Sequence, residues 1–406
     1  MNDLKFLEVK DWNFKVINID KLDKVNFVLL SLQKILMFFL TLPLILFKPQ
    51  APLFQISEVI RFKKVFNHKN WFNNLTNQKK SKTETYKNVY VDDFLVVFDD
   101  TKIYRELLQT YNDVNGLLRS QLSKLFKRIY FLLRLKTVDK IFIKNAFKVK
   151  KIHEIKDEKV LLFTNFYCNN YTHFMVEMMP KLFLMKDLLK DYKILINKTE
   201  TLDNAYDKMS YILPVLKAFG VEENKIIFIN KNEIFKIKTL TSLVNVQFKK
   251  DIHNKAFEYL HSYYVGDFKT NLGSKLYFAR KSTFRKISNE KEVAKILHKH
   301  GFVEVEMEKY DLIQQMSIMS HARTIAGITS TGIFGNMSFA KNPLTILEFR
   351  HKVNPIYPIS WTNLIQQPLT QFFLFCKKKQ KFKSFLKSDL IVDIKKLNDF
   401  LSKNTI

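Results

Sequence analysis

A histidine and a glutamate four residues apart are the first candidates for chemistry in this sequence. His173 and Glu177 lie in NYTHFMVEMMPKL (170–182), and both are within a helix predicted over residues 173–190. Residues at positions i and i+4 share one helix face, so the carboxylate can fix the tautomer of the imidazole, which then acts as a general base. The spacing leaves an alternative open, in which His173 caps or packs locally and Glu177 is its solvated partner.

Two arginines follow a predicted strand farther along the chain. Arg280 and Arg285 lie in RKSTFRKISNE (280–290), which begins at the last residue of the strand-like segment SKLYFAR. Ligands of open α/β sheets bind beyond the carboxyl ends of the strands, and the planar guanidinium group matches phosphate oxygens and keeps its charge. The pair is therefore predicted to bind a diphosphate, although a basic surface loop is an equally open alternative in a chain so rich in lysine.

Three of the eight glycines fall in AGITSTGIFGNMSF (326–339). A strand, a Gly/Ser/Thr loop and a helix start form a layout that points backbone N–H groups at a phosphate. The loop, which contains Ser330, Thr331 and Gly332, is neither a P-loop nor a G-x-G-x-x-G motif. Glu348, near the end of the next strand-like segment, could accept ribose hydroxyls. An exposed glutamate at a strand end explains its position as well.

The residues that could hold a metal are sparse. The sequence contains no Asp-x-Asp motif, the carboxylate arrangement with which a divalent metal often holds a nucleotide diphosphate, so we expect no essential metal and no cofactor. Cys168 and Cys376 are the only cysteines. Two cysteines exclude a disulfide framework and a zinc site built on cysteine, and they favour a cytosolic chain.

Alternating strands and helices must position these residues. From residue 159 onward, short apolar runs alternate with helical segments, a pattern that predicts βαβ units and parallel sheets. A break near 265–273 divides the pattern into two runs. We therefore predict an α/β fold with two Rossmann-like domains facing a cleft, at 89–265 and 266–375, followed by a basic C-terminal tail and helix at 376–406.

Residues 1–88 are predicted to form an N-terminal extension that is helical and apolar in part. Its run 27–47 is long enough to span a bilayer, but Gln33 and Lys34 lie near its middle. An interfacial helix, a buried segment and a true span all stay open.

The composition is strongly basic. Lys and Arg number 67 against 39 Asp and Glu, a formal net charge of +28. Such an excess indicates phosphate-bearing partners, namely nucleic acid, an anionic membrane face or a phosphorylated ligand. A basic amphipathic helix pair predicted at 103–135 and the run KKKQKFK in the tail fit a membrane face. Because 47% of the residues are hydrophobic, a wholly disordered chain is excluded.

Taken in order, the three clusters resemble the glycosyltransferase 61 family, over roughly residues 160–350. The family's Asn-x-x-His helix is matched by Asn170, His173, Glu177, Pro180, Lys181 and Leu182, and its paired arginines with Asn-Glu by Arg280, Arg285, Asn289 and Glu290. Its Gly-Phe pair is matched by Gly301 and Phe302, and its helical Gln by Gln315. Its Asn-x-x-Phe loop and the strand with Glu that follows are matched by Asn336, Phe339 and Glu348. One departure is clear, because the family's His-Gly-Ala segment is Ser330-Thr331-Gly332 here. A role for that histidine cannot be carried over.

The resemblance implies a GT-B-like fold and an inverting, metal-independent glycosyltransferase that uses a nucleotide sugar, expected to be UDP-linked. In this interpretation His173 or Glu177 activates the acceptor. The donor is bound by the residues Arg280, Arg285, Asn289, Ser330, Thr331, Gly332, Asn336 and Glu348.

Bacterial relatives are linked to capsule and other surface polysaccharides. We therefore expect a glycan or lipid-linked glycan acceptor, a cytoplasmic location at the inner face of the membrane, and no nucleic-acid partner. The alternative function is a non-catalytic basic module that binds nucleic acid or an anionic membrane.

Overall fold

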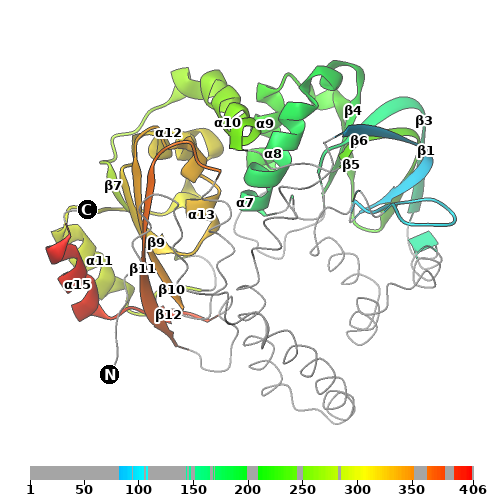
Figure 1. The fold of residues 1–406 in the computed structure, drawn as a ribbon. Coiled ribbons are helices and arrows are strands. Elements are labelled where there is room, and N and C mark those ends of the chain that lie inside the picture. The colour runs from blue at the N-terminus through cyan, green and yellow to red at the C-terminus, as the bar shows by residue number, and fades with distance from the viewer. Residues whose placement is uncertain are drawn as a thin grey trace, which may run out of the picture.

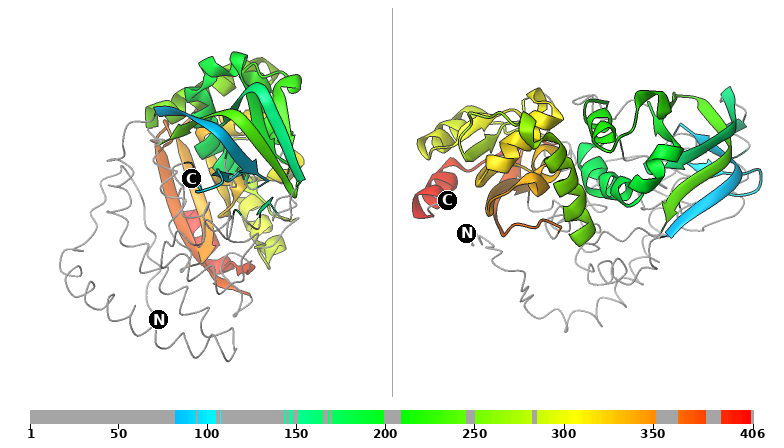
Figure 2. Two further views of the ribbon diagram at one scale, coloured as in Figure 1. Left: turned by 90° about the vertical axis from the view of Figure 1, so that its right-hand side faces the viewer. Right: turned by 90° about the horizontal axis from the view of Figure 1, so that it is seen from above.

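The protein is a mixed α/β structure with two six-stranded sheets. This computed structural model describes residues 82–93, 95–104, 107, 143, 146–147, 151–164, 168, 170–198, 209–244, 250–281, 285–351, 364–379 and 388–404. The sheets lie in separate halves of the molecule, with helices α8, α9 and α10 between them (Figures 1 and 2). The predicted extension at 1–88, with its apolar run 27–47, lies outside the described residues apart from the start of the first strand, and the helix pair at 103–135 lies almost wholly outside them.

The first sheet has the strand order β2-β1-β6-β3-β4-β5. Its strands are β1 (Lys82–Asp92), β2 (Val97–Phe98), β3 (Lys151–Leu162), β4 (Lys193–Asn197), β5 (Ile226–Ile229) and β6 (Glu233–Val244). Strand β1 runs antiparallel to β2 and β6, whereas β6, β3, β4 and β5 are parallel. Between its strands lie the helical segments α7 (Tyr171–His173), η3 (Phe174–Met178), α8 (Met179–Leu184), η4 (Lys186–Asp191), α9 (Met209–Ala218) and η5 (Glu223–Lys225).

The second sheet has the order β12-β11-β10-β9-β7-β8, and all of its pairs are parallel except β11 with β12. Its strands are β7 (Lys275–Phe278), β8 (Val303–Val305), β9 (Thr324–Ile328), β10 (Leu344–His351), β11 (Leu369–Lys378) and β12 (Leu390–Ile391). Along the chain the five parallel strands follow the spatial order 2-1-3-4-5. In that order the first strand lies between the second and the third, so connections leave β7 and β9 in opposite directions. This switch point is where open α/β sheets bind ligands.

Helix α10 (Lys250–Tyr264) joins the two halves, and the second half continues with these helical segments: η6 (Val265–Asp267), α11 (Glu290–Lys299), η7 (Met307–Lys309), α12 (Leu312–His321), α13 (Thr331–Phe334), η8 (Met337–Phe339) and α15 (Ile394–Lys403). Buried apolar side chains of both halves form one continuous cluster. Within it the ring of Phe257 on α10 lies 4.7 Å from that of Phe339 on η8. The halves are therefore packed together through their helices.

The predicted alternation of helices with parallel strands is confirmed for much of the chain. Gly220 and Gly301 follow α9 and α11 with φ angles of 75° and 82°, the left-handed conformation expected of helix C-caps. The sequence pattern did not predict β6, α10 or β11. In β6, EIFKIKTLTSLV, lysines and threonines interrupt the apolar alternation, although its second half is buried. None of the helices in the described part of the chain has the length and apolar character that a bilayer crossing requires.

Candidate functional site

The pairing of β7 with β9 brings the second and third predicted clusters together. Phe278 of β7 lies opposite Gly327 of β9, and Arg280 and Ser330 follow these residues closely. A Cβ atom at Gly327 would lie 3.2 Å from the carbonyl oxygen of Phe278, so glycine permits this close approach. Both predicted phosphate-binding segments therefore leave the sheet at its switch point, at the carboxyl ends of neighbouring strands.

The loop that carries the arginines is tied down at its far end. Arg280 and Arg285 are both half-buried. Arg285 has a φ angle of 63°, a left-handed conformation that costs about 1 kcal/mol or more outside glycine and that is often found at functional sites. The N–H group of Lys286 donates to Asp389 Oδ1 (2.9 Å), and Ser288 N–H donates to the carbonyl of Leu390 (2.7 Å). The C-terminal segment thus fixes the loop where it enters α11.

Asn289, a predicted donor-binding residue, pairs with the same C-terminal segment. Its Nδ2 donates to the carbonyl of Val392 (2.8 Å), and its Oδ1 accepts from the N–H of Val392 (3.1 Å). The amide of Asn289 thus both donates to and accepts from the backbone of Val392, as a residue of a neighbouring β-strand would. In this arrangement Asn289 holds the loop, and its contact with a donor stays a prediction.

His173 and Glu177 form the pair that their spacing predicts. His173 Nδ1 lies 2.9 Å from Glu177 Oε1. The His173 side chain is 19% exposed, whereas Glu177 is buried, so the alternative of a solvated glutamate is wrong. At the start of the helix the side chain of Asn170 accepts a hydrogen bond from His173 N–H (3.3 Å). The pair has the geometry of an oriented general base, and its catalytic role stays a prediction.

A π-helical segment, Phe174–Met178, contains Glu177. Pro180 has no N–H group, so in an α-helix the carbonyl of Val176 would lack its donor. The chain instead widens, and Met179 N–H donates to the carbonyl of Phe174, five residues back. Such π segments occur frequently at functional sites. The proline within the predicted helix was the signal in the sequence for this departure.

One buried hydrogen bond joins the His173 helix to the loop after β9. Tyr171 Oη donates to Asn336 Oδ1 at 2.5 Å. Asn336 Nδ2 in turn donates to Gln315 Oε1 (2.8 Å) and to the carbonyl of Gly332 (3.0 Å). Helices α7 and α13 are also in contact (Figure 1). The first and third clusters thus face each other across the join between the two halves.

Asn336 and Gln315 lie inside the protein at this join. Asn336 is 0% exposed, and Gln315 Nε2 donates to the carbonyls of Met307 (3.0 Å) and Tyr310 (2.8 Å). The sequence suggested Asn336 as a donor-binding residue through its family resemblance, and that contact stays a prediction. Tyr171, its partner, was missed, because nothing in a sequence pattern links residues 165 positions apart.

Glu348 lies in the second sheet at the level where β9 ends, and it is fully buried. The alternative of an exposed strand-end glutamate is therefore wrong. Thr329 Oγ1 donates to Glu348 Oε1, Gln371 Nε2 donates to Oε2 (2.7 Å), and Arg350 Nε lies 3.7 Å from Oε1. The Arg350 guanidinium group also stacks 4.9 Å from the ring centre of Phe373. Both carboxylate oxygens thus contact protein groups, and a contact with ribose stays a prediction.

The described residues contain no group of three or more His, Cys, Asp or Glu side chains that could hold a metal ion. Two of the pockets in the described part of the chain have linings that bear on the site. One, at the outer face of α11, has a volume of ≈ 600 Å³ and is lined by Lys281, Glu290, Lys291, Ala294, Lys295, His298 and Glu304. Three exposed lysines form part of its wall, and two of its lining residues, Lys281 and Glu290, belong to the segment 280–290 that carries the arginines.

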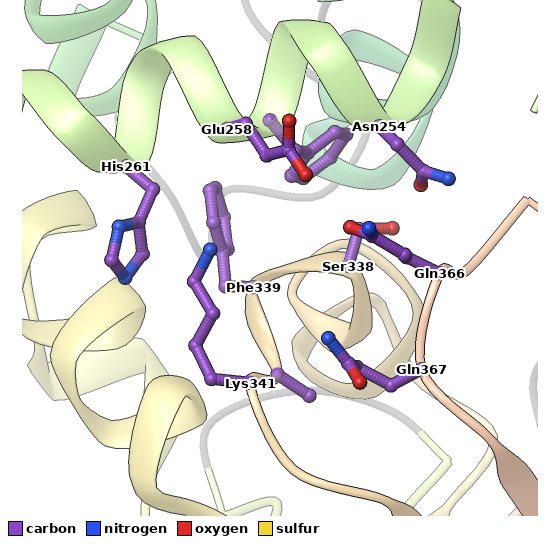
Figure 3. Close-up of a pocket in the computed structure, with 10 residues that line it drawn as sticks. Asn254, Glu258, His261, Ser338, Phe339, Lys341, Gln366 and Gln367 are labelled. Atoms are coloured by element: carbon purple, nitrogen blue, oxygen red, sulfur yellow. The ribbon is translucent and has the colours of Figure 1, made fainter. Parts of the chain in front are cut away.

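The other pocket lies between α10 and η8 (Figure 3). Its volume of ≈ 10 Å³ is about that of a single water site. Lys341 and Gln367 in its wall precede β10 and β11, so the pocket is at the amino ends of these strands. Burial lowers the pKa of Lys341, and burial together with the charge of Lys341 lowers the pKa of His261.

A comparison with protein-family models gives a match in the part of the chain that contains the candidate site. The family model described as Glycosyltransferase 61 matches residues 171–347. The match begins at Tyr171 and includes His173, both arginines and the loop after β9. Comparison with curated proteins gave no significant match.

Proposed function

Because residues 171–347 form a glycosyltransferase 61 domain, the protein is a glycosyltransferase, and we propose that it transfers a sugar with inversion from a nucleotide sugar to a surface glycan. The observation that carries the proposal is the Tyr171–Asn336 contact. It joins the helical turn that contains Tyr171 and His173 to the loop that follows β9 at the switch point. The proposed base would then lie near the strand ends at which a nucleotide is expected.

The second sheet supports a GT-B-like arrangement of two Rossmann-like halves, in which the second half binds the donor. Its 2-1-3-4-5 order is that of a doubly wound nucleotide-binding sheet. The first sheet supports this less directly, because β1 and β2 add an antiparallel edge to its parallel strands.

The proposed reaction is a single displacement at the anomeric carbon. The acceptor hydroxyl oxygen forms a bond to that carbon, and the bond from the carbon to the diphosphate oxygen breaks with its electron pair going to the diphosphate. The hydroxyl proton goes to the His173–Glu177 pair. When Nδ1–H of His173 donates to Glu177, the basic lone pair of the imidazole is on Nε2.

Arg280 and Arg285 are proposed to stabilise the diphosphate as it leaves, because guanidinium groups aimed at developing charge lower the barrier without a metal. The loop from Ser330 to Asn336 would assist with backbone N–H groups. Metal independence, a UDP-linked donor, a capsular or lipopolysaccharide-type acceptor and attachment to the inner membrane face belong to the same proposal. They rest on the family resemblance and on the basic composition.

Purified protein incubated with a panel of nucleotide sugars, with and without EDTA, tests the proposal. We expect hydrolysis or transfer with one donor, unaffected by the chelator. Arg285→Ala should abolish turnover while the protein stays folded. Lys286→Ala removes a neighbouring exposed charge from the same loop and should keep full activity. Full activity of Arg285→Ala would refute the donor-site assignment.

The base is tested separately. His173→Ala removes the imidazole, and Glu177→Gln keeps the size of the side chain but removes its charge. We expect the histidine variant to lose the larger part of kcat, because Glu177 acts through His173. Turnover retained in both variants would place the base elsewhere.

A further inference from the structure

Tyr171 contributes a hydroxyl group that no catalytic step uses. Its side chain is buried, with 3% of the residue exposed, so it cannot touch a substrate. Its ring lies edge-on to the ring of Tyr211, with centroids 5.2 Å apart, which fixes the direction in which the hydroxyl points. That direction leads out of the first half of the molecule, to Asn336 in the second.

Asn336, which receives this bond, is itself held rigidly. Its amide nitrogen donates both to Gln315 and to the carbonyl of Gly332 within the loop after β9. Gln315 is anchored in turn on two backbone carbonyls of the turn before α12. A chain of buried hydrogen bonds thus runs from the start of the His173 helix to the loop proposed to lie under the diphosphate.

Buried amide and hydroxyl groups need partners, and a network in which every member is satisfied specifies one arrangement. Tyr171 precedes His173 by two residues at the first turn of the same helix. Any shift of this turn relative to Asn336 would break the bond. The bond therefore restrains this helical turn, which includes His173, relative to the loop after β9.

We propose that Tyr171 is a positioning residue for the transfer reaction, which aligns the His173–Glu177 pair with the donor loop through its hydrogen bond to Asn336. This inference rests on the proposed function. Correct alignment of a base and a donor contributes strongly to rate, and a displacement of about 1 Å can lower the rate ~100-fold.

The test is Tyr171→Phe, which removes one oxygen atom and keeps the ring. We expect kcat to fall by roughly 10- to 100-fold with an unchanged KM for the donor, because an interaction that matters only in the transition state changes kcat alone. Binding of the nucleoside diphosphate, measured by calorimetry, should be unchanged. Unchanged kcat in Tyr171→Phe would overturn the proposal.

Tyr211→Phe is the matched control. It removes a buried hydroxyl from the neighbouring ring, whose bond is to the carbonyl of Cys168 (2.9 Å) within the same half. We expect it to keep wild-type kcat. If both variants lose kcat equally, the loss reflects general loosening of the aromatic cluster, and the positioning role is refuted.

A double-mutant cycle separates this inference from the proposed function. Tyr171→Phe, Asn336→Leu and the double variant are compared by equilibrium unfolding, which needs no substrate. Coupled residues give non-additive stability changes, and independent residues give additive ones. If the wild-type protein turns over no donor, the proposed function is contradicted. The cycle would still test whether Tyr171 and Asn336 are coupled, and additive stability changes would overturn the positioning role.

Discussion

Removing the charge of Glu348 should destabilise the protein far more than it weakens donor binding. The carboxylate is fully buried between the Thr329 hydroxyl, the Gln371 amide and the Arg350 guanidinium group, which is itself buried. Glu348→Gln keeps the shape and much of the hydrogen bonding but removes the negative charge that faces Arg350. The sequence suggested a ribose contact instead, and the two roles predict different losses.

The size of the effect follows from the burial of both partners. Breaking a buried ion pair by removing one partner costs about 3–5 kcal/mol, because the remaining charge stays out of water. Native proteins are stable by roughly 5–15 kcal/mol, so Glu348→Gln should lose a large part of that margin. Neutralising both partners, as in Glu348→Gln with Arg350→Met, should recover most of the loss, since no unpaired charge is left buried.

The free energy of unfolding is measured by guanidinium-induced unfolding of the wild type, the two single variants and the double variant. Donor binding is measured by calorimetry with the nucleoside diphosphate. We expect the single variants to unfold at clearly lower denaturant and the double variant to lie near the wild type. If Glu348→Gln keeps wild-type stability but loses donor affinity, the structural role is refuted and the ribose contact is supported.

Three further outcomes are expected. Burial lowers the pKa of His253 from 6.5 to about 3. Between these pH values the unfolded chain binds a proton that the folded protein excludes, so the free energy of unfolding decreases as the pH falls from 6.5 towards 3. In His253→Gln this decrease should be smaller when the free energy of unfolding is measured against pH. Asn289→Ala should lower the free energy of unfolding by about 1–2 kcal/mol in the same assay, because both backbone groups of Val392 lose their side-chain partner. Gly327→Ala should destabilise by roughly 1–3 kcal/mol in the same unfolding assay, because its Cβ would press on the backbone of Phe278.

The sequence predicted best where local signals and burial agree. TIAGI and LTILEF are short apolar runs next to turn residues, and both are strands in the second sheet. Glycines at C-caps marked the ends of α9 and α11. In β6 the signal failed, because this strand is covered only in part along its first half and its lysines and threonines hide the period.

The site was predictable as separate clusters but not as one place. His173 and Glu177 meet because helix geometry is local. Arg280 and the loop after β9 are neighbours because β7 pairs with β9, which the order of strands along the chain does not reveal. The buried state of Glu348 depends on Gln371 and Arg350, and the strand that carries Gln371 was not predicted at all.

The C-terminal segment shows how part of the basic tail supports the candidate site. It was predicted as a separate tail at 376–406, yet β12 extends the second sheet and α15 packs against α11 through a stripe of buried apolar residues. Ile287 forms a bridge with Leu390, and Asn289 pairs with Val392. The loop with Arg285 is thus held between α11 and the last strand. Some of the lysines in this segment therefore belong to an element that supports the loop of the proposed diphosphate site. Fewer of the positive charges then need to be explained by binding to a membrane face.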